Sequence, residues 1–271
     1  MRENTARPEV AIIGFGHVGR LMQRIFPDAL VYDKFQPEVS APREAVMGCR
    51  FAFVCVPTDI GAEGAADLSN VWEVAGWLKA ETVVLRSTVP PGTSRRLAQE
   101  TGHRVVFWPE YCGEWAYVTP WEQSPEGWPS VILGGEPEVT REIVELVAPR
   151  LGPSKTYRQV PAEAAELCKY MENSWLAAQV IFSWQFRLLA DACGADFWEV
   201  RDLWGLDPRV SKAHTAAFLA SRGFGGKCLP KDLSAITTYG AEAGVDVSFL
   251  AAIKQFNETL RSEESDAADR S

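Results

Sequence analysis

The turn at residues 14–19 constrains the fold of this chain more than any other stretch. In the segment IIGFGHVG, glycines stand at 14, 16 and 19, after the apolar run EVAII and before a segment with helical spacing. Asp33 closes the next apolar run, 19 residues beyond Gly14. A strand, a G-x-G-x-x-G turn, a helix and an acid at the end of the following strand together predict a dinucleotide-binding site.

The residues of this turn have separate physical roles. Gly14 makes the turn, Gly16 lets a pyrophosphate approach the backbone, and Gly19 packs the helix on the strand. His17 and Val18 complete the expected cofactor contacts, and His17 is interpreted as a helix-start residue rather than a catalyst. The alternative is a glycine-rich turn that holds no ligand.

The acid at position 33 indicates which dinucleotide to expect. The carboxylate of Asp33 would hydrogen-bond the ribose hydroxyls and repel a 2′-phosphate, so the sequence predicts NAD. Lys34, directly after Asp33, is the one feature that favours NADP instead, because its positive charge could attract the 2′-phosphate.

Apolar runs alternate with helical segments along the first 150 residues, which predicts βαβ units and a parallel sheet. The expected strands lie at 9–13, 30–33, 51–56, 82–88, 104–109 and 129–135, and the expected helices include 17–26, 68–79 and 137–149. The predicted fold class is therefore α/β, with an N-terminal doubly wound Rossmann sheet over residues 1–155.

After residue 150, the alternation of apolar runs and helical segments gives way to a mainly helical pattern. A strand and a linker are expected at 150–161, followed by one long helix over 162–195 that contains almost no helix breakers. Such a helix is too long for the surface of one small domain, so we expect it to be the spine of an all-helical domain spanning 156–262. The segments expected to follow are helices at 196–204, 231–243 and 246–261, a loop at 221–230, and a polar, disordered tail at 263–271.

Charge and cysteine content narrow the class of protein. The net charge of −9 argues against nucleic acid or an anionic membrane as the main partner. No apolar run is long enough for a membrane span, and the N-terminus has no apolar signal segment. The six cysteines form no C-x-x-C pair, so we expect reduced thiols, no metal site and a cytoplasmic protein.

Three pairs of polar residues at i, i+4 spacing suggest chemistry. In GFGGKCLPKD, Cys228 follows a glycine-rich loop, stands between two lysines and precedes Asp232, which is the setting of a nucleophile rather than of a structural thiol. The other pairs are Lys169 with Asn173 and Glu110 with Glu114. Lys169 lies in a mostly apolar helix and is either held in a pocket or part of a solvated stripe; solvated faces are the alternative for each pair.

Six segments carry a resemblance to a known family, from the glycine-rich turn to about residue 260. They are AIIGFGHVG, VCVPTD with GAADLSNV, RSTVPPGT, PEYCGE, ELCKYMENSWLA and GFGGKCLPKD. The chain resembles the UDP-glucose/GDP-mannose dehydrogenases. The resemblance implies an NAD-dependent oxidoreductase that converts a primary alcohol, usually C6 of a nucleotide-linked hexose, to a carboxylate with two NAD per turnover.

The same resemblance implies the roles of individual residues. Cys228 would attack the intermediate aldehyde to give a thiohemiacetal and then a thioester, while Lys169 and Asn173 stabilise the oxyanion. Asp232 and Thr88 would move protons, and Glu110 would be the base for thioester hydrolysis. Glu114, as a further catalytic residue, would lie near the nicotinamide and help position the water for that hydrolysis. The remaining contacts are assigned as follows: Thr58, Thr88 and Glu114 with the cofactor, and Glu110, Lys169, Asn173, Gly225 and Lys231 with the substrate.

The chain departs from the family pattern in its substrate-binding parts. Family members usually carry a C-terminal nucleotide-gripping domain, and this chain is interpreted as a short form without it, to which a partner chain could supply the missing domain. Gly113 stands where the family has arginine, Trp115 where it has glycine, and AAFLAS lacks the usual Asn/Pro pattern. A nucleotide sugar and a smaller alcohol therefore both remain open as substrates.

Two further functions stay open beside the four-electron oxidation. One is a two-electron alcohol dehydrogenase, and the other is a non-catalytic NAD-binding scaffold. The helix at 162–195 is apolar on more than one face, and in the family its equivalent packs across a two-fold axis, so we expect a homodimer.

Overall fold

The computed structural model describes residues 8–112 and 124–268, with side chains described as far as residue 262. The described chain divides into two compact units. Unit 1 comprises residues 8–59, 67–112 and 124–169, and unit 2 comprises residues 60–66 and 170–268.

Unit 1 is built on a seven-stranded sheet in the order β2-β1-β3-β4-β5-β6-β7. The strands are β1 (Val10–Ile13), β2 (Leu30–Tyr32), β3 (Phe51–Val54), β4 (Thr82–Leu85), β5 (Arg104–Phe107), β6 (Ser130–Gly135) and β7 (Thr156–Val160). Neighbouring strands are parallel except β5 and β6, which are antiparallel. The α/β prediction is confirmed. The antiparallel pair differs from the expected all-parallel sheet, and the described part of its connection contains no helix of the kind a parallel crossover uses.

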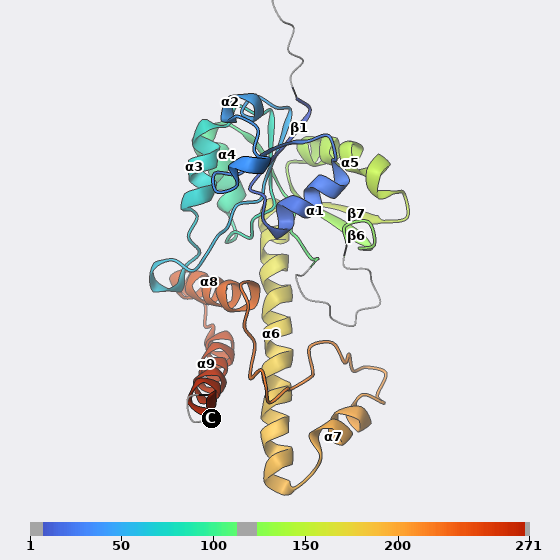
Figure 1. The fold of residues 1–271 in the computed structure, drawn as a ribbon, viewed down its shortest axis with the longest axis vertical. Helices are drawn as coiled ribbons and strands as arrows, with labels where there is room; N and C mark the ends of the chain where they lie inside the picture. The colour runs from blue at the N-terminus through green and yellow to red at the C-terminus, as the bar shows by residue number, and fades with distance from the viewer. Residues whose placement is uncertain (1–7, 113–123, 269–271) are drawn as a thin grey trace, which may run out of the picture. The chain divides into compact units, whose positions relative to one another are not determined.

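Helices cover both faces of this sheet, as Figure 1 shows. One face packs against α1 (His17–Ile25) and α5 (Pro137–Leu151), and the other packs against α2 (Arg43–Val46), α3 (Ser69–Trp77) and α4 (Thr93–Thr101). Strands β1, β3 and β4 are buried along their whole length, which explains why their sequences are continuous apolar runs rather than alternating ones. The short 3-10 helices η1 (Pro37–Val39) and η2 (Ala62–Gly64) complete the connections.

The strand order reverses at β1, which has β2 on one side and β3 on the other. The chain leaves β1 toward α1 on one face of the sheet and leaves β3 toward α3 on the other face, so a crevice opens at the carboxyl ends of these two strands. The glycine-rich turn follows β1 and Asp33 follows β2, and both therefore lie at this crevice.

Unit 2 is helical. Its elements are the greater part of α6 (Ala162–Cys193), then α7 (Phe197–Trp204), α8 (Cys228–Glu242) and α9 (Ser248–Ala268). The predicted long helix is confirmed, and it ends where Gly194 adopts a φ of +75°, the left-handed conformation common at helix ends. Trp184, Phe197, Leu233 and Ile253 belong to the core of this unit.

Three boundaries differ from the sequence prediction. Helix α8 begins at Cys228, three residues before the expected start at 231. Helix α9 continues to Ala268, so most of the tail predicted to be disordered from 263 is helical; its Glu and Ala residues extend an existing helix at little cost. The expected domain boundary at 155–156 falls inside unit 1, because β7 pairs with β6 and Ala165 packs into the sheet core.

Within the described ranges, none of the helices combines the length and apolar character that a membrane-spanning helix requires.

Candidate functional site

The glycine-rich turn of unit 1 is shaped to admit a ligand at its middle glycine. Gly14 has a φ of +94°, donates its N–H to the Tyr32 carbonyl oxygen (2.8 Å), and has no room for a Cβ, which would lie 2.7 Å from the Cys55 carbonyl oxygen. A Cβ on Gly19 would collide with the Gly14 carbonyl oxygen. A Cβ on Gly16 would meet nothing within 4 Å, so the backbone there faces open space.

The carboxylate of Asp33 is fixed at the end of β2. Its Oδ2 accepts from the Phe15 N–H (2.7 Å) and its Oδ1 from the Phe35 N–H (2.8 Å). Lys34 reaches across to α3, where its ammonium pairs with Glu73 (2.8 Å) and donates to Asn70 (3.1 Å). These residues rim a hollow at the crevice, whose lining includes Gly14, Asp33, Phe35, Pro57, Asn70, Glu73 and Trp77.

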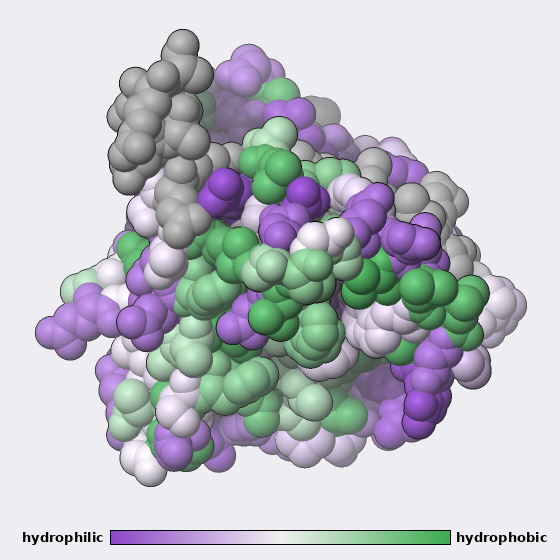
Figure 2. All heavy atoms as spheres, turned by 90° about the horizontal axis from the view of Figure 1, so that it is seen from below, coloured by the Kyte–Doolittle hydropathy of each residue, from purple (hydrophilic) through white to green (hydrophobic). Residues whose placement is uncertain are grey.

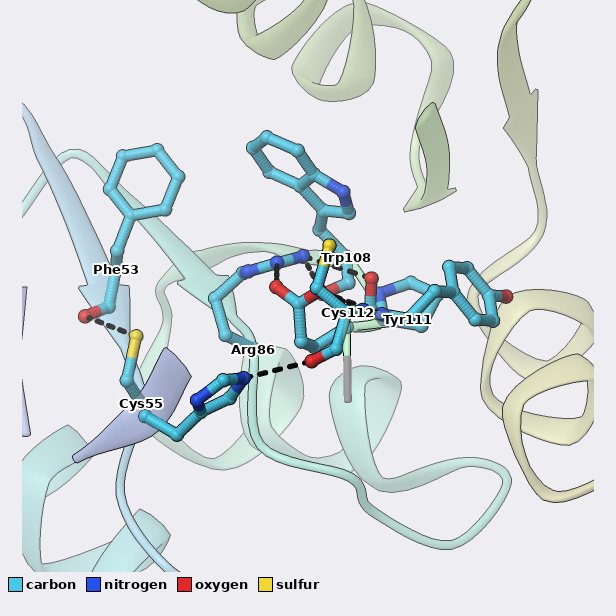
Figure 3. A network of polar contacts seen from close by, with 9 residues as sticks. Phe53, Cys55, Arg86, Trp108, Tyr111 and Cys112 are labelled. Carbon is cyan, nitrogen blue, oxygen red and sulfur yellow. Dashed lines mark hydrogen bonds and ion pairs between the residues drawn. The ribbon is translucent and has the colours of Figure 1, made fainter. Parts of the chain in front are cut away.

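Arg86 is the centre of a buried polar network directly after β4. Its side chain is only 2% exposed and pairs with Glu110. Its Nη1 donates to the carbonyl oxygens of Trp108 (2.5 Å) and Pro109 (3.0 Å), and its guanidinium lies 4.2 Å above the Trp108 ring. Figure 3 shows Arg86 pointing toward the turn that carries Trp108, Tyr111 and Cys112. One arginine therefore holds this turn through its backbone, a ring and a carboxylate.

Glu110 is anchored by this network. Beyond the ion pair with Arg86, its Oε1 accepts from the N–H groups of Tyr111 (2.8 Å) and Cys112 (2.6 Å). The role of base stays a prediction for Glu110, and the three donors around its carboxylate favour an anchoring role. Glu114, together with Gly113 and Trp115, lies outside the described residues.

His17 ties the start of α1 to the same turn. It is the first residue of the helix, as the sequence predicts, and Val18 follows it in the first turn. Its Nε2 lies 2.9 Å from the Cys112 carbonyl oxygen. Because a carbonyl oxygen only accepts, Nε2 carries the proton in this hydrogen bond. His17 therefore has a structural contact.

The cysteines separate into inert and accessible thiols. Burial raises the pKa of Cys55 to about 12, a shift that Arg86 opposes, and burial also raises the pKa of Cys112 well above its usual range. Cys49 is buried as well. Cys168, Cys193 and Cys228 are exposed, and these three are the accessible candidates for a nucleophile.

Lys169 is held in a pocket rather than on a solvated stripe. Its side chain is largely buried, at 8% exposed, and its ammonium lies 4.9 Å from the centre of the Tyr111 ring. That ring stacks on Trp128, with centroids 5.9 Å apart and an angle of 11° between the planes. The lysine ammonium therefore lies close to one ring of an aromatic pair.

Two further sets of hydrogen bonds fix residues of unit 1, and the first involves a residue that precedes Lys169 in the chain. One helical turn earlier, the fully buried carboxylate of Glu166 accepts from the N–H groups of Gly92 (2.6 Å) and Ser94 (2.8 Å) at the start of α4. Burial raises the pKa of Glu166, and the hydrogen bonds from Ser94 and Gly92 oppose that shift. Thr58 donates to the Thr88 carbonyl oxygen (2.8 Å), which brings the two predicted cofactor contacts together.

In unit 2, Cys228 is the first residue of α8 and is exposed. Partial positive charge gathers at a helix N-terminus, and Cys228 stands at that end of α8. Asp232, one turn on, is 1% exposed; it accepts from the Asn173 side-chain amide (2.5 Å) and pairs with Lys231. Four predicted site residues, Asn173, Cys228, Lys231 and Asp232, are thus brought onto neighbouring turns of α6 and α8.

The glycine loop before Cys228 is held by a residue that the sequence did not single out. Asn257 of α9 is 6% exposed; its Oδ1 accepts from the Phe224 N–H (2.7 Å) and its Nδ2 donates to the Phe224 carbonyl oxygen (3.1 Å). Gly223 has a φ of +66° and would collide with Asn257 if it carried a Cβ. Gly225 is exposed in the same loop.

Sequence reasoning also missed Arg86, Tyr111 and Glu166. A charge directly after the buried run TVVL was the available signal for Arg86, because such a group has to find partners. Glu166 could not be separated from a solvated helical acid. Within the described part of the chain, no group of three His, Cys, Asp or Glu side chains is placed to hold a metal ion.

A family model and the curated relatives of this chain point to the same protein family. Residues 163–259 match the model for the central domain of the UDP-glucose/GDP-mannose dehydrogenase family. A UDP-glucose 6-dehydrogenase from Pseudomonas aeruginosa is 30% identical over 231 residues, covering 79% of this chain and 49% of that protein. A GDP-mannose 6-dehydrogenase from the same organism is 28% identical over 236 residues, covering 79% of this chain and 52% of the relative. The chain thus spans about half the length of these curated relatives.

Solved structures show the same fold. A UDP-glucose dehydrogenase from Pyrobaculum islandicum superimposes with a TM-score of 0.79 at 24% identity, covering 96% of this chain and 70% of that one. A UDP-D-ManNAc dehydrogenase from Pyrococcus horikoshii gives a TM-score of 0.74 at 24% identity, covering 94% and 69%.

Proposed function

Because this chain belongs to the UDP-glucose/GDP-mannose dehydrogenase family, we propose that it oxidises a primary alcohol of a nucleotide-linked sugar to a carboxylate, with NAD as oxidant. The observation that carries the proposal is the arrangement around Cys228. An exposed thiol stands at a helix N-terminus, one turn from a buried Asp232 that Asn173 and Lys231 hold. A two-electron alcohol dehydrogenase has no need of this thiol.

The residues of unit 1 fit NAD. The open space at Gly16 suits a pyrophosphate against the backbone, and the fixed carboxylate of Asp33 suits ribose hydroxyls. The charge of Lys34 is already paired with Glu73, so it offers little to a 2′-phosphate. Gly14, Gly16, His17, Val18, Gly19, Asp33, Thr58 and Thr88 would hold the cofactor, with Glu114 as a further predicted contact.

The proposed chemistry centres on covalent catalysis. NAD, when bound, accepts the two hydride ions that this oxidation releases. The Cys228 sulfur would add to the carbon of the intermediate aldehyde, and oxidation of that thiohemiacetal would leave a thioester. Water would then attack the thioester carbon and break the carbon–sulfur bond, which releases the carboxylate and restores the thiol. Overall, one alcohol, one water and two NAD⁺ give one carboxylate, two NADH and three protons.

The other predicted residues would act on charge and protons. Lys169 and Asn173 would stabilise the oxygen on which negative charge develops. Asp232 would exchange protons with water, assisted by Thr88. Gly225 and Lys231 would contact the substrate. A partner chain that supplies further nucleotide contacts stays a prediction.

The proposal is tested by incubating the purified chain and NAD with a panel of nucleotide sugars and free sugar alcohols, with absorbance at the NADH band and mass analysis of the product. The expected result is two NADH for each alcohol consumed and a product heavier by the replacement of two hydrogens with one oxygen. One NADH would mean a two-electron dehydrogenase, and none with any substrate would leave an NAD-binding scaffold.

The coenzyme preference gives a specific expectation. Replacing Asp33 with asparagine removes the charge that would bind the ribose hydroxyls, so the Kd for NAD should rise by roughly tenfold, the order expected for a hydrogen bond to a charged group. Calorimetric titration with NAD and NADP measures this, and the preference for NAD over NADP should narrow. Asp28→Asn, at an exposed position of the same unit, is the matched control. An unchanged Kd for NAD in the Asp33 variant would contradict the assignment.

The surface of α6 supports the predicted homodimer. Met171, Trp175, Phe182, Phe186 and Leu189 recur on one side of the helix at helical spacing, and they are between 44% and 75% exposed. Figure 2 shows hydrophobic residues gathered over much of the face that it views. Unpaired apolar surface of this kind marks an association site. We propose an isologous dimer through this face.

Light scattering at micromolar concentration should therefore give twice the chain mass of 29.9 kDa. Leu189→Glu places a charge in the proposed interface at a position that is 59% exposed, so the variant should fold and behave as a monomer. Arg141→Glu, on an exposed position of α5, should leave the mass unchanged. A monomeric wild type would refute the dimer.

A further inference from the structure

The contact between Lys169 and Tyr111 adds a residue to the site that neither the sequence pattern nor the family comparison assigns. The ammonium lies 4.9 Å from the ring centre, and Lys169 is 8% exposed. A largely buried ammonium loses much of its hydration, and the negative face of an aromatic ring replaces part of it.

Three further contacts fix Tyr111, two through its side chain and one through its backbone. The Tyr111 ring stacks nearly parallel to the Trp128 ring, with 5.9 Å between the ring centroids. Its backbone N–H donates to Glu110 (2.8 Å), which Arg86 fixes in turn. Its hydroxyl donates to Cys168 Sγ at 3.8 Å, on the same helix as Lys169. In Figure 3, Tyr111 extends from the turn on the side away from Arg86. The buried network therefore contacts the Tyr111 backbone, and the side chain contacts Lys169 and Cys168 of α6.

We propose that Tyr111 is a positioning residue whose ring face sets the place of the Lys169 ammonium. A carboxylate at this position would also stabilise the charge, but it would take up N–H donors in directed hydrogen bonds. A ring face attracts the ammonium as a whole and accepts no directed hydrogen bond from one N–H, which suits a lysine proposed to stabilise an oxyanion. This inference rests on the proposed function for the identity of that oxyanion.

The test compares two substitutions at one position. Tyr111→Phe keeps the ring face and removes the hydroxyl, whereas Tyr111→Leu removes the ring. Steady-state NADH formation should show kcat lowered by about tenfold in the leucine variant, the size of a partly buried cation–π contact, with KM within about twofold of the wild type. The phenylalanine variant should retain the wild-type kcat. A tenfold loss in both variants would overturn the proposal, because the hydroxyl and its contact with Cys168 would then be responsible.

A second measurement works without turnover. The apo protein is treated with limiting acetic anhydride, and the extent of acetylation of each lysine is read by mass spectrometry. Removing the ring should raise the labelling of Lys169 about fivefold relative to the exposed Lys79, whereas Tyr111→Phe should label like the wild type. Equal labelling of Lys169 in all three proteins would overturn the contact itself.

These two readouts separate the inference from the function on which it rests. If the wild type forms no NADH with any substrate but labelling of Lys169 follows the ring, the proposed function fails and the positioning contact stands. If the wild type is active and the leucine variant matches it in both kcat and labelling, the contact fails and the function stands.

Discussion

Replacing Cys228 with serine should lower the rate of carboxylate formation by at least about 10³-fold, as is usual when a covalent nucleophile is removed. At neutral pH a serine hydroxyl is far less ionised than a thiol, so it adds poorly to an aldehyde. An oxygen ester also releases its acyl group more slowly than a thioester. The variant should therefore stall after the first hydride transfer, or at a covalent ester.

The substitution should leave cofactor binding intact, because the glycine turn and Asp33 belong to unit 1 and Cys228 belongs to unit 2. Single-turnover NADH formation, calorimetric titration with NAD, and intact-protein mass spectrometry for a trapped adduct measure the three quantities. Cys193→Ser is the matched control, since it changes the same side chain at another exposed position of unit 2. Acid formation at the wild-type rate by the Cys228 variant would show that the covalent route is wrong.

The second large effect concerns stability. Replacing Arg86 with methionine should cost about 3–5 kcal/mol of the free energy of unfolding, because it leaves the Glu110 carboxylate buried beside an apolar chain. The side chains of this pair are 2% and 12% exposed, so water cannot replace the lost partner. The carbonyl oxygens of Trp108 and Pro109 lose their donor as well.

Urea unfolding followed by tryptophan fluorescence measures this cost. Arg96→Met is the control, because it removes the same charge from an ion pair with Glu100 whose side chains are 64% and 50% exposed. That pair should contribute less than about 1 kcal/mol. Adding Glu110→Gln to the Arg86 variant should recover part of the lost stability, since the unpaired charge disappears. Equal effects of the Arg86 and Arg96 substitutions would contradict the anchoring role.

Glu110→Gln alone distinguishes an anchor from a base. An anchor that loses its charge weakens the pair with Arg86, so stability should fall while any remaining folded enzyme still releases acid. A base would behave differently, because a thioester would accumulate on Cys228 of the folded variant.

Local patterns were sufficient for the elements that depend on neighbouring residues. The glycine turn, the strands of unit 1 and the long helix at 162–193 follow from short apolar runs, their periods and the absence of breakers. The patterns did not place Cys228 and Asp232 on one helical turn, because the helix was expected to begin at 231 and Cys228 was assigned to the loop before it.

What the sequence could not give depends on contacts between distant segments. Arg86 and Glu110 are 24 residues apart, and Asn257 lies 33 residues from Phe224. Nothing local to Glu110 distinguishes an acid that faces substrate from one that is enclosed by an arginine and two backbone donors. The antiparallel β5–β6 pair is a similar case, because strand direction depends on the connection rather than on the strand's own residues.

The two hydrogen bonds between the Asn257 side chain and the Phe224 backbone limit how far the chain can be truncated from its C-terminal end. The amide holds both the N–H and the carbonyl of one loop residue, so the conformation of the loop before Cys228 is specified from α9, near the far end of the described chain. A fragment that stops before residue 257 would keep every predicted reactive side chain and still lose the backbone restraint on its glycine loop. Fragments intended for chemistry should therefore retain α9 through Asn257.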